Sequence, residues 1–195
     1  MQTIIYLIRH GDFTNTDGLI YGRMPGFHLN ENGKKQLEKT AQFLQDKSID
    51  EIYASPLERA KESAAIVQKK LGLPAIHISE EIIEIKTSYQ GMKFSDLDPL
   101  QSEVYLKPLS PSDETIEQLA RRMMKFLRYI YQTYPGKRIA AVSHGDPIMA
   151  LKAEIKHHSY EFLPFKTDEY VQHGEVYEIT SDENNKLSIK TVFKP

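Results

Sequence analysis

Three short stretches of the sequence combine residue types that bind or transfer phosphate. Arg9, His10 and Gly11 close an apolar run near the N-terminus, residues 55–59 read Ser-Pro-Leu-Glu-Arg, and residues 143–147 read Ser-His-Gly-Asp-Pro. A guanidinium group presents a planar fork of N–H donors that suits phosphate or carboxylate, and glycine lets the backbone approach a ligand closely. Two arginines and two histidines that converge on one crevice would make a site for a phosphoryl group.

Each of these stretches follows a predicted β-strand. Residues 4–8 are an almost unbroken run of β-branched and aromatic residues, which is typical of a strand buried on both faces. Residues 49–54 and 138–142 predict the strands that precede the other two stretches. Ligands of open α/β sheets bind beyond the carboxyl ends of the strands. We therefore expect the site at the carboxyl ends of the strands that begin near Thr3 and Arg138.

Helix-start signals accompany the second stretch. Ser55 as N-cap, Pro56 at the first helical position and Glu58 at the third would form a capping box with the favoured proline. An apolar stripe at helical spacing follows, and Gly72 ends it. The pattern predicts that Arg59 lies in the first turn of this helix.

The third stretch carries a similar signal. Asp146 as N-cap and Pro147 at the first helical position predict a helix through about Lys156. His144 would then lie just before a helix N-terminus. Free backbone N–H groups and the positive end of the helix dipole favour a bound anion there, and they disfavour a permanently protonated imidazole.

The other helices and strands are also readable from their patterns. Asn30 can cap a helix over about 31–47. Ser112, followed by two acidic residues, opens the longest helix, which Pro135 and Gly136 end. Further strands are predicted at 75–78, 175–180 and 187–193.

Two long segments have neither helical nor strand periodicity. Residues 12–29 predict a loop at the mouth of the site, and residues 86–111 predict an irregular flap. Together with the regular elements they predict one domain over residues 1–195. The fold class is α/β: a three-layer α/β/α sandwich with a mainly parallel central sheet, helices on both faces and an antiparallel edge from the C-terminal strands.

Composition restricts the classes of partner and of site that the chain can have. It has 195 residues, 40% of them hydrophobic, a formal net charge of −2 and a pI near 6.4, so bulk charge gives no reason to expect nucleic acid or an anionic membrane. The absence of cysteine excludes a thiol nucleophile and a Cys-based zinc site. The N-terminus has no basic region before its apolar run, and no stretch approaches the ~20 apolar residues of a membrane span. We expect a cytoplasmic protein with a small-molecule partner.

The motifs LIRHG, SPLERAKESA and VSHGDPI, in this order, resemble the signature elements of the histidine phosphatase superfamily, in its phosphoglycerate mutase-like branch. The resemblance implies that His10 is the nucleophile, which becomes a transient phosphohistidine. It also implies that Arg9, Arg59 and His144 bind the phosphoryl oxygens, and that no metal or other cofactor takes part. Arginines beside His10 would repel a metal cation.

The leaving alkoxide needs a proton donor, which in the family is a Glu followed at a set distance by a Gly. Glu84 and Gly91 are the best match, although many members place the glycine eight residues after the acid and this chain places it seven residues after. A one-residue shift could hand the role to Glu81 or Asp12. We favour Glu84.

Secondary contacts are predicted at two further positions. Arg23 lies where relatives have additional phosphate or substrate contacts, and Gly145 belongs to the phosphate-binding set that follows His144. The acid-phosphatase branch has an Asp at the position of Gly145, which argues against that branch. The remaining histidines, including His173, have no metal-like spacing and are interpreted as structural.

Three functions remain to be compared. The leading hypothesis is a metal-independent phosphomonoester hydrolase that acts through His10. A phosphoglycerate mutase would return the phosphoryl group to a substrate, but that branch usually has a longer insert than residues 86–111. A non-catalytic domain that binds a phosphorylated ligand would have no need of a nucleophile.

Overall fold

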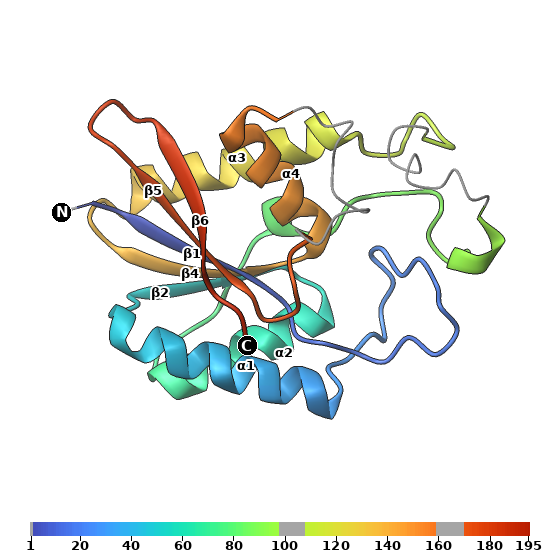
Figure 1. Ribbon diagram of the computed structural model, residues 1–195, viewed down its shortest axis with the longest axis horizontal. Coiled ribbons are helices and arrows are strands. Elements are labelled where there is room, and N and C mark those ends of the chain that lie inside the picture. Colours follow the sequence, from blue (N-terminus) through green and yellow to red (C-terminus); the bar gives the residue numbers. More distant parts are fainter. Residues whose placement is uncertain (1, 98–107, 159–169) are drawn as a thin grey trace.

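The structure is a computed structural model that describes residues 2–97, 108–158 and 170–195. Six strands within these residues form one sheet in the order β3-β2-β4-β1-β5-β6 (Figure 1). Their bounds are β1 Ile4–Arg9, β2 Glu51–Ala54, β3 His77–Ile78, β4 Arg138–Ser143, β5 Val176–Ser181 and β6 Leu187–Phe193. Strands β3, β2, β4 and β1 pair in parallel, whereas β5 and β6 are antiparallel. The predicted mainly parallel sheet with an antiparallel C-terminal edge is confirmed.

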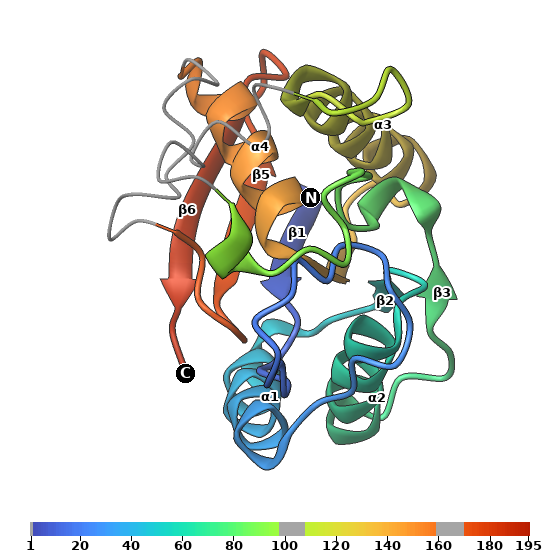
Figure 2. The same cartoon turned by 90° about the vertical axis from the view of Figure 1, so that its right-hand side faces the viewer.

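Helices cover both faces of the sheet. Helices α1 (Glu31–Leu44) and α2 (Glu58–Leu71) lie on one face, and α3 (Ile116–Thr133) and α4 (Gly145–Lys156) on the other, as Figures 1 and 2 show from two directions. Three short 3-10 helices add single turns: η1 Gln45–Lys47, η2 Glu80–Ile82 and η3 Phe94–Asp96. The predicted three-layer α/β/α architecture is therefore confirmed. Among the described residues, none of the helices is both long and apolar enough for a membrane span.

Strand β1 supplies side chains to both apolar layers. Ile5 and Leu7 join the cluster under α3 and α4, whereas Tyr6 and Ile8 join the cluster over α1 and α2. All four side chains are 3% exposed or less, because β1 is covered on both faces. Burial of a side chain of this size contributes roughly 1.5–3 kcal/mol, so the strand that carries the first phosphate motif is strongly fixed.

Helix α2 begins later than its sequence signal predicts. Its first residue is Glu58 and its N-cap is Leu57, which makes no side-chain capping bond. The predicted capping box at Ser55 is therefore wrong. Pro56 disfavours helical backbone at the residue before it, and the Ser55 hydroxyl bonds His144 Nε2 at 2.7 Å instead. The predicted end is confirmed, since Gly72 caps the helix with φ 68°.

Helix α4 begins earlier than predicted. His144 itself is the N-cap and Gly145 is the first helical residue, so Asp146 is not the cap. The Asp146 carboxylate accepts a hydrogen bond of 2.7 Å from the Tyr170 hydroxyl. Pro147 is tolerated at the third position because N–H groups of the first turn have no partner within the helix. His144 is thus held closer to the helix N-terminus than the sequence indicates.

Helix α3 also begins at a different cap. Thr115 caps it through Gln118 in a reciprocal capping box, so the predicted start at Ser112 is wrong. Asp113 instead organises the preceding loop, where its carboxylate accepts hydrogen bonds from Ser88 N at 2.8 Å and from Leu109 N at 3.0 Å. An acidic side chain near a helix start can serve a loop as well as a cap.

The mouth loop and the first part of the flap lie against each other. Ile20 N donates to Met92 O at 2.8 Å, and Gly91 N donates to Ile20 O at 2.9 Å. Gly91 has φ +90°, a backbone conformation that favours glycine over residues with a side chain. Both segments are largely irregular, as predicted, and residues 98–107 of the predicted flap lie outside the described residues.

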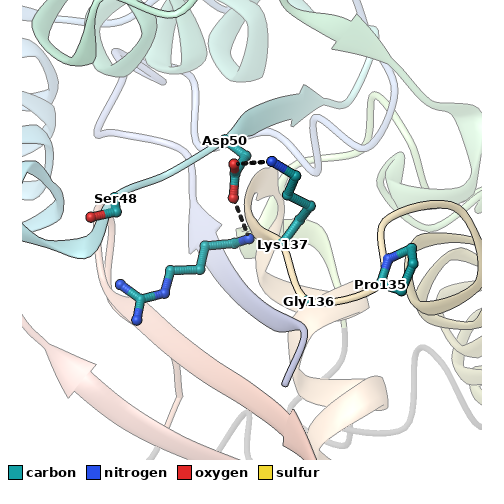
Figure 3. A pocket seen from close by; sticks show the side chains of 6 residues that line it. Ser48, Asp50, Pro135, Gly136 and Lys137 are labelled. Carbon is teal, nitrogen blue, oxygen red and sulfur yellow. Dashed lines mark hydrogen bonds and ion pairs between the residues drawn. The ribbon is translucent and has the colours of Figure 1, made fainter. Parts of the chain in front are cut away.

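The amino end of the parallel sheet contains a pocket whose charges are paired (Figure 3). Asp50 accepts hydrogen bonds from Lys137 Nζ at 2.7 Å and from Arg138 N at 2.8 Å. The Arg138 guanidinium donates to Lys47 O at 2.8 Å. This end of the sheet lies opposite the end where the phosphate motifs meet.

Candidate active site

The carboxyl ends of β1 and β4 bring the two predicted histidines together. The ring centroids of His10 and His144 are 5.1 Å apart, and both residues are completely buried. Arg59 reaches the same place from the first turn of α2, where its Nε donates to His10 Nε2 at 3.3 Å. The two histidines converge as predicted, because β1 and β4 are parallel neighbours and end at the same edge.

The tautomer of His10 follows from its backbone contact. Its Nδ1 lies 2.8 Å from Gly11 O, and since a carbonyl only accepts, Nδ1 carries the hydrogen. Burial, followed by the neighbouring His144 and Arg9, lowers the pKa of His10 well below its usual value of 6.5. His10 is therefore neutral at physiological pH, with the Nε2 lone pair directed at Arg59.

The two predicted arginines keep N–H groups without partners. Arg9 donates from Nη1 to Val171 O at 2.7 Å, and its buried Nε has no hydrogen-bond partner among the described residues. Arg59 donates from Nη2 to Gly22 O at 2.8 Å, and its buried Nη1 is likewise unpaired within those ranges. Burial lowers the pKa of Arg59. Unpaired buried cation donors are costly unless a ligand satisfies them, and a phosphoryl group offers the matching acceptors.

The Ser55 hydroxyl orients His144. Leu57 N donates a long bond of 3.4 Å to Ser55 Oγ, and His144 Nε2 lies 2.7 Å from the same oxygen; in the tautomer that suits an anion site, the Ser55 hydroxyl donates its proton to Nε2. His144 Nδ1 then carries the other hydrogen. That atom is buried and has no hydrogen-bond partner in the part of the chain that the structure describes. Burial and the charge of Arg59 lower the pKa of His144 well below 6.5, so it is a neutral donor.

Glu84 lies beside the two histidines. Its Oε2 is 4.0 Å from His144 Nδ1, and its Oε1 accepts from Ile85 N at 2.8 Å. Burial, followed by the charge of Asp146, raises the pKa of Glu84 to about 8. Its carboxyl group is therefore largely protonated at neutral pH and can serve as an acid.

The two alternative acids have different surroundings. Glu81 forms an ion pair with Lys125 on the surface. Asp12 accepts hydrogen bonds from the Asn30 and Asn32 side chains at 3.0 and 3.1 Å, and these bonds lower its pKa although burial acts in the other direction. Asp12 is therefore not held as a protonated acid, the Glu81 side chain pairs with Lys125, and Glu84 is the better candidate.

The two predicted secondary contacts have protein partners. Arg23 donates from Nε to Glu84 O at 2.7 Å and from Nη2 to Glu114 Oε2 at 3.2 Å. A Cβ atom on Gly145 would lie only 2.0 Å from the Tyr170 hydroxyl, so the glycine allows Tyr170 to pack over the helix start. The backbone N–H of Gly145 belongs to the first turn of α4, where an anion is favoured.

A third histidine in the site was interpreted from the sequence as structural. The ring centroid of His173 lies 5.3 Å from that of His10, and its buried Nε2 has no hydrogen-bond partner among the described residues. Burial lowers its pKa to about 3. The strand pairing accounts for its position. Because β5 runs antiparallel beside β1, the residues just before β5, which include His173, lie at the carboxyl end of β1. Gly174 N indeed donates to Arg9 O at 3.0 Å.

The described residues contain no group of three or more His, Cys, Asp or Glu side chains that could hold a metal ion. What converges on His10 is instead a set of cationic and neutral N–H donors together with one buried acid. This arrangement can bind a tetrahedral anion, attack it with an imidazole and protonate a leaving group.

Comparison with solved structures gives the same fold. YhfR of Bacillus stearothermophilus matches with a TM-score of 0.84 and 22% identity, over 97% of this chain and 96% of that one. The mycobacterial glucosyl-3-phosphoglycerate phosphatase Rv2419c matches with a TM-score of 0.81 and 17% identity, over 98% and 97%. At this identity the likeness shows the fold alone.

Sequence comparison identifies the family. PhoE of Bacillus subtilis, an uncharacterized phosphatase, is 33% identical over 157 residues, which are 79% of this chain and 78% of PhoE. A metal-independent phosphoserine phosphatase of Arabidopsis thaliana is 30% identical over 164 residues, which are 78% and 68% of the two chains. The model of the histidine phosphatase superfamily (branch 1) matches residues 5–189. The protein is thus a phosphatase, and its chain belongs to the histidine phosphatase superfamily, branch 1.

Proposed function

We propose that the protein is a metal-independent phosphomonoester hydrolase that works through a phosphohistidine on His10. The observation that carries the proposal is the unprotonated His10 Nε2, which is surrounded by N–H donors of Arg9, Arg59 and His144 and lies in the same buried site as the protonated Glu84. This arrangement supplies the four parts that phosphoryl transfer needs: a nucleophile, cations, a neutral donor and an acid.

In the first step, His10 Nε2 attacks the phosphorus atom. The N–P bond forms and the ester P–O bond breaks, while charge accumulates on the equatorial phosphoryl oxygens. Arg9 Nε, Arg59 Nη1 and His144 Nδ1 are the buried unpaired donors that would bind these oxygens. Glu84 gives its proton to the leaving alkoxide, which departs as an alcohol.

In the second step, water replaces the alcohol. Glu84, now a carboxylate, takes a proton from the attacking water, and the new P–O bond forms as the N–P bond breaks. His10 returns to its neutral form, Glu84 is protonated again, and inorganic phosphate leaves. The net reaction consumes one water and releases one alcohol and one phosphate, so one hard displacement is divided into two easier ones.

The electrostatics of the site support chemistry without a metal. Arg9 and Arg59 lie close enough to lower the pKa of His10, which means that positive charge already occupies the surroundings of the nucleophile. A divalent cation beside these guanidinium groups would be repelled. The cations of the protein itself can carry out the charge stabilisation that a metal supplies elsewhere.

The proposed substrate is a small phosphomonoester. The relative from Arabidopsis thaliana is named a phosphoserine phosphatase. A relative from Hydrogenobacter thermophilus, 27% identical to this chain, is named a putative phosphoserine phosphatase. Phosphoserine is therefore a natural first compound for a substrate panel. 3-Phosphoglycerate belongs in the same panel, because it also reports the mutase alternative.

The test measures phosphate release from an aryl phosphate and from this panel, in EDTA, for the wild type and for His10→Ala. We expect the wild type to remain active in EDTA and His10→Ala to lose roughly 10⁴-fold or more of kcat/KM. Rapid quenching with ³²P-labelled substrate should trap an acid-labile, base-stable phosphoenzyme in the wild type and none in the variant.

His77→Ala is the matched control, since His77 is a half-exposed histidine of β3 that pairs with Glu51. It should retain wild-type activity. Loss of wild-type activity in EDTA would exclude metal independence. Isomerisation of 3-phosphoglycerate without phosphate release would favour the mutase, and a folded but inert wild type would favour a binding domain.

A further inference from the structure

The backbone that carries Glu84 is held from helix α3 by one arginine. Arg122 donates from Nη1 to Glu81 O at 2.7 Å and from Nη2 to Glu84 O at 3.2 Å. A single guanidinium group therefore binds carbonyls at both ends of the turn that leads to Glu84. The planar fork of the guanidinium group fixes the positions of both acceptor carbonyls at once.

A carboxylate fixes the orientation of that guanidinium. Glu114 accepts from Arg122 Nε at 2.7 Å and from Arg122 Nη2 at 3.0 Å, which is a bidentate pair. The Glu114 carboxylate also accepts from Lys86 N at 3.2 Å, and Glu114 N donates to Lys86 O at 2.8 Å. Glu114 thus pairs with the backbone two residues after Glu84, while Arg122 binds the backbone at and before it.

Arg23 joins the same network from the mouth loop. Its Nε donates to Glu84 O at 2.7 Å, and its Nη2 donates to Glu114 Oε2 at 3.2 Å. The side chains of Glu114 and Arg122 are only 13% and 15% exposed, so solvent screens their pairing less than that of surface charges. Two guanidinium groups and one carboxylate therefore meet around a single carbonyl, that of Glu84.

We propose that Arg23, Glu114 and Arg122 form a clamp whose function is to position Glu84 as the proton donor. The three are positioning residues, since among the described residues their side chains form hydrogen bonds with one another and with the backbone around Glu84 rather than with the histidines. The clamp also explains how Glu84 can be well placed although Gly91 follows it after seven residues rather than eight. The backbone at Glu84 is fixed by α3 and the mouth loop, and its position does not depend on the distance to the glycine.

The inference rests on the proposed function, in which Glu84 protonates the leaving group. Proton transfer requires the donor within hydrogen-bond reach of the leaving oxygen, and a misplacement of about 1 Å can cost on the order of 10²-fold in rate. An alkyl phosphate releases a strongly basic alkoxide and needs the acid. An aryl phosphate such as p-nitrophenyl phosphate releases a stable phenolate and hardly needs it.

The ratio of alkyl to aryl phosphate hydrolysis is therefore the diagnostic quantity. We would measure kcat/KM for phosphoserine and for p-nitrophenyl phosphate in the wild type, Glu84→Gln, Glu114→Gln and Arg122→Lys. Both substrates are assayed on the same preparation, so partial unfolding lowers both rates equally and leaves the ratio unchanged. Lys125→Met is the matched control, because Lys125 binds the Glu81 side chain from the same helix without contacting the Glu84 carbonyl.

We expect Glu84→Gln to lower the ratio by roughly 10²-fold or more, and Glu114→Gln and Arg122→Lys to lower it by roughly 10–100-fold. Lys125→Met should leave it unchanged. In the Glu84→Gln background, Arg122→Lys should lower it no further. If Glu84→Gln lowers the ratio but both clamp variants keep it at the wild-type value, the clamp proposal is wrong. If Glu84→Gln itself leaves the ratio unchanged, the proposed role of Glu84 fails instead.

Discussion

The two ends of the parallel sheet use the same kinds of charged residues in opposite ways. At the amino end, Asp50 pairs with Lys137 (Figure 3), and the Arg138 guanidinium donates to a backbone carbonyl. At the carboxyl end, Arg9 Nε and Arg59 Nη1 are buried N–H groups that have no partner among the described residues. Paired charges contribute to the fold, whereas the unpaired buried donors would contribute to binding in the proposed function.

This difference has an energetic consequence. A buried polar group without a partner costs about 1–3 kcal/mol relative to one that is satisfied, and more when it is charged. The carboxyl end therefore lowers the stability of the ligand-free protein, and a bound phosphoryl group would recover part of the loss by mass action. Neutralising a charge at the carboxyl end should lower activity without lowering stability. Neutralising a charge at the amino end should lower stability without lowering activity.

The largest effect is expected at Arg59. Arg59→Met keeps most of the apolar stem but removes the guanidinium beside His10 Nε2. We expect kcat/KM to fall by roughly 10³-fold, as for loss of a preorganised donor to a developing charge. The free energy of unfolding should stay equal or rise, because the variant no longer buries a cation whose Nη1 has no partner among the described residues. Phosphate release checks the predicted fall in kcat/KM, and denaturant unfolding of the same preparation checks the predicted free energy of unfolding.

Arg121→Met is the matched control for this variant, since Arg121 is an exposed arginine of α3. It should change neither quantity appreciably. A clear loss of stability in Arg59→Met would contradict the comparison, because it would mean that Arg59 is a structural cation like those of the amino end.

The sequence predicts those parts of the fold that depend on local pattern. The apolar run of residues 4–8 predicts β1, and Gly72 predicts the end of α2; the structure confirms both. The convergence of His10 and His144 followed from one topological rule, that parallel neighbouring strands end at the same edge.

Long-range contacts of single side chains cannot be predicted from local pattern. Ser55 has the residue type and spacing of a helix cap, but its hydroxyl bonds a histidine 89 positions away. His173 has no motif around it and reaches the site only because β5 pairs with β1. The substrate contact of Arg23 stays a prediction, and the side chain binds Glu84 O and Glu114. Local propensity contains no information on such tertiary partners.

The buried acid Glu84 should make the free energy of unfolding depend on pH. Glu84 has a folded-state pKa of about 8 against a usual value of 4.5, so the folded protein holds a proton that the unfolded chain has released over this window. By linkage, the Glu84 contribution to stability falls as pH rises from 4.5 to 8 and is lost in full above that range. Glu84→Gln does not titrate, so its stability should exceed that of the wild type by more than about 1 kcal/mol above pH 8.

Denaturant unfolding of both proteins at several pH values checks this, and the difference should shrink toward zero near pH 4.5. Hydrolysis of an alkyl phosphate by the wild type should decline over the upper part of the same window, as the acid loses its proton. A stability difference that does not change with pH would show that Glu84 is ionised in the folded protein, and its role as an acid would have to be abandoned.

The smallest effect is expected at the amino end, from Asp50→Asn. The variant loses the ion pair with Lys137 but keeps an oxygen that can accept from Arg138 N. We expect a loss of roughly 1 kcal/mol in unfolding free energy and unchanged kcat/KM. Hydrogen bonds from Lys137 and from Arg138 N lower the pKa of Asp50 below 3.8, so the loss should be complete above that pH and disappear below it. The exposed Asp46→Asn serves as control. An activity loss in Asp50→Asn without a stability loss would mean that the two ends of the sheet are coupled rather than independent.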